Sequence, residues 1–285
     1  MKDIQIKKIV NVKVLTILIL ILSLILYSCN ESDGIPEDTT PYETLFEEVG
    51  GNSLQVFAGG KGGSTIVFEC GLGDDGPIWF ANNLFQEMLT NNQVIAYNRA
   101  GHCPSTFTEG EIRGLESMTN DLATLISVNS LNEKVILVGH SLGGAIIRNY
   151  AIHHPGKVKA LLFIDPTHED YNDYDSLSQT IEDEMVQHYH DLDIPGGALE
   201  AAQLIENRSI LQNLPSLPNI PVVVITSMKL SEGTGEPDRQ DWFNAHQTLG
   251  EGISNFRHIS TTNSGHYIFL EEPQLIIGQI NELSK

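Results

Sequence analysis

The chain has 285 residues, of which 41% are hydrophobic and 19% charged, so it is long and apolar enough for one large domain or two small ones. It carries 37 acidic and 16 basic residues, which give a formal net charge of −21. Because a chain this acidic repels phosphate backbones, we expect no nucleic-acid partner. Its three cysteines are too few for a disulfide scaffold.

The amino terminus has the pattern of a targeting segment. Four lysines precede a run rich in Leu and Ile at 14–26, which is shorter than the roughly 20 residues of a membrane span. The sequence Leu26-Tyr27-Ser28-Cys29 follows and resembles the bacterial lipobox. The resemblance implies that 1–28 is a lipoprotein signal peptide and that Cys29 is lipidated. An uncleaved signal anchor with an incidental Cys29 thiol is the alternative.

This interpretation predicts a protein of the bacterial cell envelope, anchored by lipid on the periplasmic or cell-surface face of a membrane. Its acidic body gains nothing from anionic headgroups, so the acyl chains on Cys29 would have to hold it there. Residues 29–44 are polar and predict a flexible tether. We expect the folded domain to occupy 45–285.

From there apolar strands alternate with helices. The pattern predicts strands at 54–58, 65–69, 93–98, 134–138, 158–164, 221–226 and 256–261 and helices at 78–89, 115–128, 142–153 and 273–283. Such near-continuous apolar strands are typical of a parallel sheet covered by helices on both faces, an α/β fold.

The segment 167–218 breaks this alternation. Its pattern predicts helices at 176–190 and 198–211 and no central strand. Fifty residues are more than a crossover between strands needs. We therefore predict a helical cap, inserted over the carboxyl edge of the sheet, where open α/β sheets place their ligands.

A serine stands where a buried strand turns into a helix. Gly139-His140-Ser141-Leu142-Gly143 fits the pattern G-x-S-x-G, directly after one predicted strand and before a helix. In this context the hydroxyl is exposed on a sharp turn above the sheet, and the glycines let backbones approach closely. Ser141 is our candidate nucleophile.

A serine nucleophile requires oxyanion donors and a general base. The loop Gly71-Leu72-Gly73 after an earlier strand can supply the N–H of Leu72, with the N–H of Leu142 as the second donor. His266 follows the last predicted strand in Ser264-Gly265-His266 and is the candidate base.

The acid that orients this base is ambiguous. Asp165 ends the strand 158–164, where a buried carboxylate is costly unless it is paired. The strand 221–226 has no acid at its end, and Asp238 is the alternative farther along the chain. Glu236 and Asp241 remain further options, as does the absence of an acid.

These motifs, with Tyr97-Asn98-Arg99-Ala100-Gly101 before Ser105, occur in the order seen in the α/β-hydrolase superfamily, which this chain resembles over about 45–285. The resemblance implies an eight-stranded, mostly parallel sheet with the cap after the sixth strand. An acid directly after the sixth strand, as at Asp165, looks like the arrangement in one branch of the haloalkane dehalogenases and their relatives. Those enzymes use an aspartate nucleophile, so Ser141 disfavours dehalogenation and epoxide opening. Cys70-Gly71 stands where many members have His-Gly before the oxyanion residue.

The resemblance implies a carboxylesterase-like serine hydrolase for small or medium neutral esters that needs no cofactor. Lipase, thioesterase and peptidase activities stay open, as do a non-catalytic surface binding module and a cofactor-free lyase or peroxidase-like enzyme. We expect no metal site at His188 and His190, because residues two apart on a helix point to different sides. Cys70 and Cys103 could form a disulfide or stay free thiols.

Overall fold

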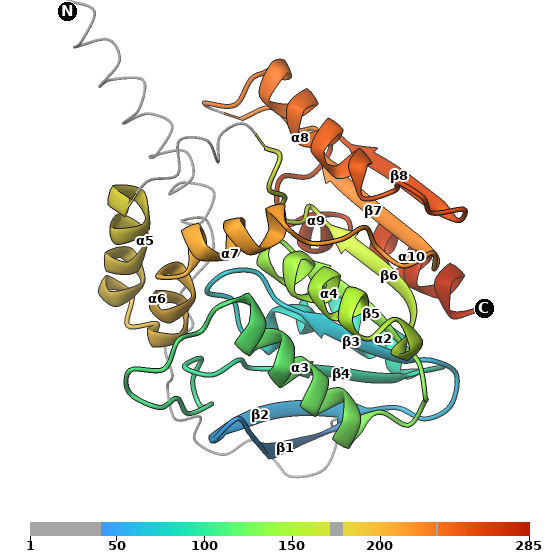
Figure 1. Ribbon diagram of the computed structural model, residues 1–285. Coiled ribbons are helices and arrows are strands. Elements are labelled where there is room, and N and C mark those ends of the chain that lie inside the picture. Colours follow the sequence, from blue (N-terminus) through green and yellow to red (C-terminus); the bar gives the residue numbers. More distant parts are fainter. Residues whose placement is uncertain (1–40, 172–178, 232) are drawn as a thin grey trace, which may run out of the picture.

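The computed structural model of the chain describes residues 41–171, 179–231 and 233–285 (Figure 1). The expected signal peptide, the lipidation site Cys29 and most of the expected tether lie outside the described residues. None of the helices in the described ranges has the length and hydropathy of a membrane span.

The strands of the described residues form a single eight-stranded sheet in the order β1-β2-β4-β3-β5-β6-β7-β8. The first two neighbouring pairs are antiparallel and all the others are parallel. The predicted α/β-hydrolase fold with its mostly parallel sheet is therefore confirmed. The strands are β1 (Tyr42–Val49), β2 (Asn52–Gly59), β3 (Thr65–Glu69), β4 (Gln93–Tyr97), β5 (Val135–His140), β6 (Val158–Ile164), β7 (Val222–Ser227) and β8 (Phe256–Thr261).

Helices cover both faces of this sheet (Figure 1). They are η1 (Gly76–Asn83), α2 (Leu84–Leu89), α3 (Leu115–Asn129), α4 (Leu142–His153), η2 (Pro155–Lys157), α5 (Gln179–Asp191), α6 (Pro195–Ala201), α7 (Leu204–Gln212), α8 (Glu236–Thr248), α9 (Ile268–Glu271) and α10 (Pro273–Ser284). Helices α3 and α4 pack on one face, and α2 and α10 pack on the other.

The two faces explain why the central strands are apolar at every position. In β5, Leu137 belongs to the core under α3 and α4, whereas the next residue, Val138, belongs to the core under α2 and α10. Successive side chains of a strand point to opposite faces, so a strand buried on both sides has no polar alternation.

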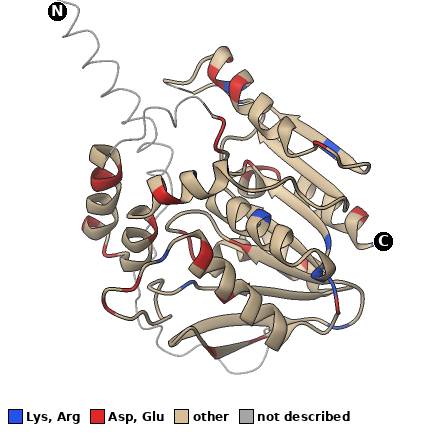
Figure 2. Ribbon diagram, in the orientation of Figure 1, with Lys and Arg blue, Asp and Glu red and all other residues tan. Residues whose placement is uncertain are grey.

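The cap lies where the sequence places it, between β6 and β7, and consists of α5, α6 and α7. It has a small core of its own, which includes Met185, Tyr189 and Ala198. Figure 2 shows acidic positions along the ribbon of α5, a helix that contains four Asp and Glu residues and no Lys or Arg.

Several elements differ from the predictions. The expected helix over 78–89 is broken, because Asn82 and Asn83 adopt left-handed backbone angles and separate η1 from α2. The expected helix over 198–211 is two helices, α6 and α7. The strand β1 and the helix α8 were not predicted.

Cys70 is a free, buried thiol and therefore does not pair with Cys103. It accepts a hydrogen bond from Nε1 of Trp79 at 3.1 Å, and its Sγ lies 3.2 Å from the carbonyl oxygen of Asp75. Cys70 is thus a packing residue at the end of β3.

Candidate active site

Ser141 occupies the sharp turn between β5 and α4. Its backbone has φ 51° and ψ −119°, a conformation that non-glycine residues rarely adopt. The neighbouring glycines make the turn possible, because a Cβ added to Gly143 would lie 2.3 Å from the carbonyl oxygen of Glu69, and one on Gly144 would lie 2.4 Å from Cβ of Pro166. The turn therefore presses against the ends of β3 and β6 and holds Ser141 at the carboxyl edge of the sheet.

His266 and Asp165 are paired. Nδ1 of His266 lies 2.7 Å from Oδ2 of Asp165, although the two residues are 101 positions apart. The Asp165 side chain is only 1% exposed, whereas that of His266 is 26% exposed. The carboxylate thus engages the inner nitrogen of the ring and leaves Nε2 as the nitrogen available for chemistry.

The other carboxylate oxygen of Asp165 is also occupied. Oδ1 accepts hydrogen bonds from the backbone N–H of Ser227 at 3.0 Å and from Nε1 of Trp242 at 2.7 Å. Burial alone would raise the pKa of Asp165, but the hydrogen bond and charge attraction of His266, the field of His246 and the Ser227 N–H together hold it below its usual value. Asp165 therefore stays ionised although its side chain is buried.

The His266 ring lies against the turn that carries Ser141. The ring of His140, the residue before Ser141, is 4.5 Å from the His266 ring between centroids, and His140 Nε2 lies 3.1 Å from the His266 carbonyl oxygen. Within the described part of the chain, Ser141 Oγ makes no hydrogen bond to His266. In enzymes without substrate this contact is often long and shortens in the complex.

Asp238 lies elsewhere and has a different partner. It is in the first turn of α8, where its Oδ2 accepts a hydrogen bond from the backbone N–H of Gly235 at 2.7 Å. This is the reach-back contact of a helix cap. The structure therefore brings Asp165, and not Asp238, to His266.

The two expected oxyanion donors lie on neighbouring segments. Leu142 is the first residue of α4, and Leu72 is in the loop after β3, whose end contacts the Ser141 turn through Gly143. In the described ranges, neither the N–H of Leu72 nor that of Leu142 donates to another group of the protein. Both N–H groups therefore remain candidate oxyanion donors.

Sequence reasoning missed the two donors that hold Asp165. Ser227 ends β7, and Trp242 lies on α8, which is largely polar and was not predicted as a helix. A lone tryptophan in a polar segment was the available signal for the latter, since a buried indole N–H needs an acceptor.

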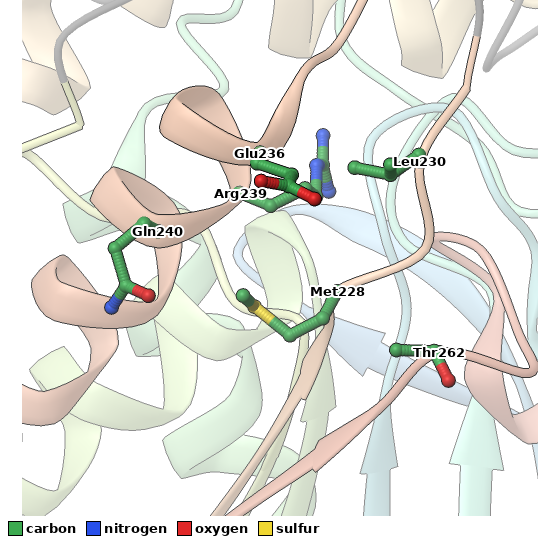
Figure 3. A pocket seen from close by; sticks show the side chains of 6 residues that line it. All are labelled: Met228, Leu230, Glu236, Arg239, Gln240 and Thr262. Carbon is green, nitrogen blue, oxygen red and sulfur yellow. The ribbon is translucent and has the colours of Figure 1, made fainter.

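A cavity of about 340 Å³ lies next to the end of β7 and the start of α8, the two segments that hold Asp165 (Figure 3). Its lining comes from the residues after β7, from α8 and from the turn after β8: Met228, Leu230, Glu236, Arg239, Gln240 and Thr262. The wall therefore combines apolar side chains with one cation and one carboxylate, next to the segment that binds Asp165.

No group of three or more His, Cys, Asp or Glu side chains that could hold a metal ion is present among the described residues. His188 and His190 lie on α5, the first half-buried and the second exposed.

Comparisons with known proteins place this chain in a family. A family model described as the alpha/beta hydrolase fold matches residues 64–277. The uncharacterized protein YqjL of Bacillus subtilis is 23% identical over 217 residues, which cover 76% of this chain and 82% of YqjL. The crystal structure of the Cif epoxide hydrolase from Acinetobacter nosocomialis is similar with a TM-score of 0.65 and 15% identity, over 86% of this chain and 90% of that one.

A thermophilic esterase from Thermogutta terrifontis has a TM-score of 0.61 and 17% identity, over 84% of this chain and 97% of its own. At this identity the solved structures show a shared fold, and the family model covers most of the chain. The chain therefore belongs to the α/β-hydrolase fold family.

Proposed function

We propose that this protein is a serine hydrolase that cleaves carboxylic esters, with Ser141 as nucleophile, His266 as general base and Asp165 as the acid that orients it. The observation that carries the proposal is the 2.7 Å contact between Oδ2 of Asp165 and Nδ1 of His266. It fixes the proton of a neutral imidazole on Nδ1 and leaves Nε2 free to accept one. The fold shared with the Thermogutta terrifontis esterase supports the same reaction class.

The reaction begins when Nε2 of His266 takes the hydroxyl proton of Ser141. Oγ then forms a bond to the ester carbonyl carbon, and the N–H groups of Leu72 and Leu142 bind the oxyanion. The bond to the alcohol breaks, and the imidazolium gives its proton to the leaving oxygen. Water then attacks the acyl-serine by the same route, with His266 as base, and releases the carboxylic acid.

The buried Asp165 stabilises each imidazolium that forms. Its low pKa keeps it charged while His266 gains and loses the proton, so the attraction strengthens in the transition state. Every step uses side-chain and backbone groups of this chain, so the proposed reaction needs no metal or organic cofactor.

The charge of the cap bears on the substrate. Helix α5 of the cap exposes Asp183, Glu184 and Asp191 and contains no Lys or Arg. A negative surface on the cap repels polyanionic compounds. We therefore infer that small or medium neutral esters are preferred over large anionic ones.

A panel of p-nitrophenyl acyl esters tests the proposal, with Ser141→Ala as the matched variant. We expect turnover by the wild-type protein and a loss of roughly 10⁶-fold in kcat in the variant, as in other serine hydrolases. Equal rates in the two proteins would reject catalysis at Ser141. Binding without turnover would instead indicate a binding module, and products other than an acid and an alcohol would indicate a lyase or peroxidase-like enzyme.

We further propose that the protein is anchored to a bacterial membrane through Cys29. The support is the lipobox-like sequence at 26–29 after a short apolar run. Detergent phase partition of the full chain expressed in bacteria tests this. The wild-type protein should enter the detergent phase and Cys29→Ala should not, whereas identical partition of both would contradict lipidation.

A further inference from the structure

A cluster of buried charges lies where the cap meets the sheet, and the proposed triad does not use it. Glu69 ends β3, Arg99 follows β4, and Glu200 comes from α6 of the cap; each of the three is at most 2% exposed. His102 joins them, with Nε2 at 2.9 Å from Oε1 of Glu200. Buried charges of this kind are tolerated only when they are paired and hydrogen-bonded, and losing one partner is costly.

Arg99 connects the carboxylates to the loop after β3. Its Nε lies 2.6 Å from Oε1 of Glu200 and its Nη1 lies 2.9 Å from Oε1 of Glu69. The guanidinium also donates to two backbone carbonyls of the loop, that of Cys70 at 2.9 Å and that of Gly71 at 2.5 Å. The Gly71 carbonyl belongs to the same peptide group as the N–H of Leu72.

Two cap residues hold the next peptide group of this loop. Oε2 of Glu200 accepts the N–H of Gly73 at 3.1 Å, and the Tyr189 hydroxyl donates to the Leu72 carbonyl at 3.0 Å. The Tyr189 ring also lies on the backbone, because a Cβ added to Gly73 would be 2.2 Å from Cε1 of Tyr189. Both ends of the Leu72–Gly73 peptide are therefore bonded to the cap.

We propose that Arg99, Glu200 and Tyr189 are positioning residues that aim and polarise the Leu72 N–H. The cap thereby completes the oxyanion site as well as covering it. This inference rests on the proposed function, in which Leu72 N–H binds the oxyanion of the substrate.

The physical reason is the cooperativity of amide hydrogen bonds. A cation on the Gly71 carbonyl draws electron density from that peptide and makes its N–H a stronger donor, by about 10–30% per bond. One oxyanion donor is worth about 10²–10³ in kcat. Strengthening the Leu72 N–H donor by about 10–30% therefore corresponds to a change in kcat of about two- to eightfold.

Glu200→Gln is the decisive substitution. The two carboxylate oxygens of Glu200 accept from Arg99, His102 and Gly73 N–H, so every neighbour is a donor. In Glu200→Gln an NH₂ group replaces one of the two carboxylate oxygens. Because NH₂ is itself a donor, at least one neighbouring donor is left without an acceptor. The substitution keeps the shape of the side chain and releases either the guanidinium or the loop.

Glu182→Gln is the matched control. Glu182 is also a buried glutamate of the cap and also accepts from a backbone N–H, that of Ile205 at 2.9 Å, but it makes no contact with the loop after β3 in the described residues. The second pair is Tyr189→Phe, which removes only the hydroxyl on the Leu72 carbonyl, and Tyr150→Phe, which alters a buried tyrosine of α4.

The assay measures kcat and KM on a p-nitrophenyl ester and the Ki of a trifluoromethyl ketone with the same acyl chain. Such a ketone takes the Ser141 oxygen onto its carbonyl carbon, the hydroxyl proton passes to His266, and the resulting oxyanion occupies the oxyanion site. Hydrogen exchange of the Gly73 amide reports the loop without any need for turnover.

We expect Glu200→Gln to lower kcat about fivefold and to weaken the ketone by a similar factor, with KM within about twofold and faster exchange at Gly73. Tyr189→Phe should change kcat and Ki in the same direction, which keeps the inference testable if Glu200→Gln does not fold. Both control variants should stay within about twofold of the wild-type values.

If the wild-type protein turns over ester, unchanged kcat and Ki in Glu200→Gln and Tyr189→Phe would overturn this inference and leave the proposed function standing. Equal losses in Glu200→Gln and Glu182→Gln would also overturn it, since they would indicate general loosening of the cap. A wild-type protein without ester turnover or ketone binding would overturn the proposed function and this role of Leu72 together.

Discussion

Replacing Asp165 by asparagine changes one proton in the proposed triad and little else. Oδ1 of Asp165 accepts the Ser227 N–H and the Trp242 indole N–H, and an asparagine oxygen can accept both. The new NH₂ group then takes the place of Oδ2, 2.7 Å from Nδ1 of His266. Because NH₂ is a donor, Nδ1 must become the acceptor and the ring proton moves to Nε2.

An imidazole protonated on Nε2 cannot accept the proton of Ser141. In a serine protease the same exchange leaves the geometry intact and lowers kcat about 10⁴-fold. That factor corresponds to about 5.5 kcal/mol of transition-state stabilisation. We expect a loss of this order in Asp165→Asn, with binding of a neutral ester nearly unchanged.

The assay is ester turnover per folded molecule, with Asp238→Asn as the matched control. Asp238 caps α8 through the Gly235 N–H, so its replacement should cost at most about 1 kcal/mol of stability and leave kcat within about twofold. An Asp165→Asn protein that keeps more than a tenth of the wild-type kcat would refute the reasoning. A large loss in Asp238→Asn would refute it too.

Three further predictions concern the supporting structure. Gly143→Ala places a Cβ 2.3 Å from the Glu69 carbonyl oxygen and should lower the free energy of unfolding by about 1–3 kcal/mol; unchanged urea unfolding would contradict this. Burial lowers the pKa of His246 to about 3, below the unfolded value of about 6.5, so stability falls as the pH drops below 6.5. At pH 5 this lowers the free energy of unfolding by about 2 kcal/mol. Between pH 7 and pH 5 the free energy of unfolding of His246→Asn should therefore fall by about 2 kcal/mol less than that of the wild-type protein. Equal decreases in the two proteins would show that His246 is not neutral when folded. Trp242→Phe removes a donor to Asp165 worth about 1.5 kcal/mol and should lower kcat by roughly tenfold in a folded protein, whereas full activity would mean that this bond does not hold the carboxylate.

The core of the fold could be predicted because its signals are local. The strands β3, β6 and β8 have the predicted bounds, and the turn at Ser141 follows directly from a buried strand and the glycines after it. Each of these features is encoded within about ten neighbouring residues, where hydrophobic patterning and glycine placement are informative.

Elements with weak apolar patterns could not be predicted in this way. Strand β1 lies at the edge of the sheet, buries only one of its eight residues and includes Glu43, Glu47 and Glu48. Helix α8 buries few side chains, among them Trp242 and His246. Tertiary contacts stabilise both elements, and such contacts leave little trace in a short window of sequence.

The surroundings of the site depend on contacts between distant residues. Asp165 binds an N–H 62 positions away and an indole 77 positions away, and these contacts distinguish its environment from that of Asp238. Glu200 is one of many acids in an acidic cap, and its contacts with Gly73, Arg99 and His102, about 100 or more positions earlier, separate it from a solvated charge. No pattern along the chain encodes such pairings.

The reactivity of one hydroxyl tests the account most directly. Wild-type protein is treated with a fluorophosphonate, digested and mapped by mass spectrometry, beside His266→Ala as a variant that lacks the base. We predict a single adduct on the peptide that contains Ser141, formed far more slowly without the imidazole. An unlabelled Ser141, or labelling at the same rate without His266, would contradict it.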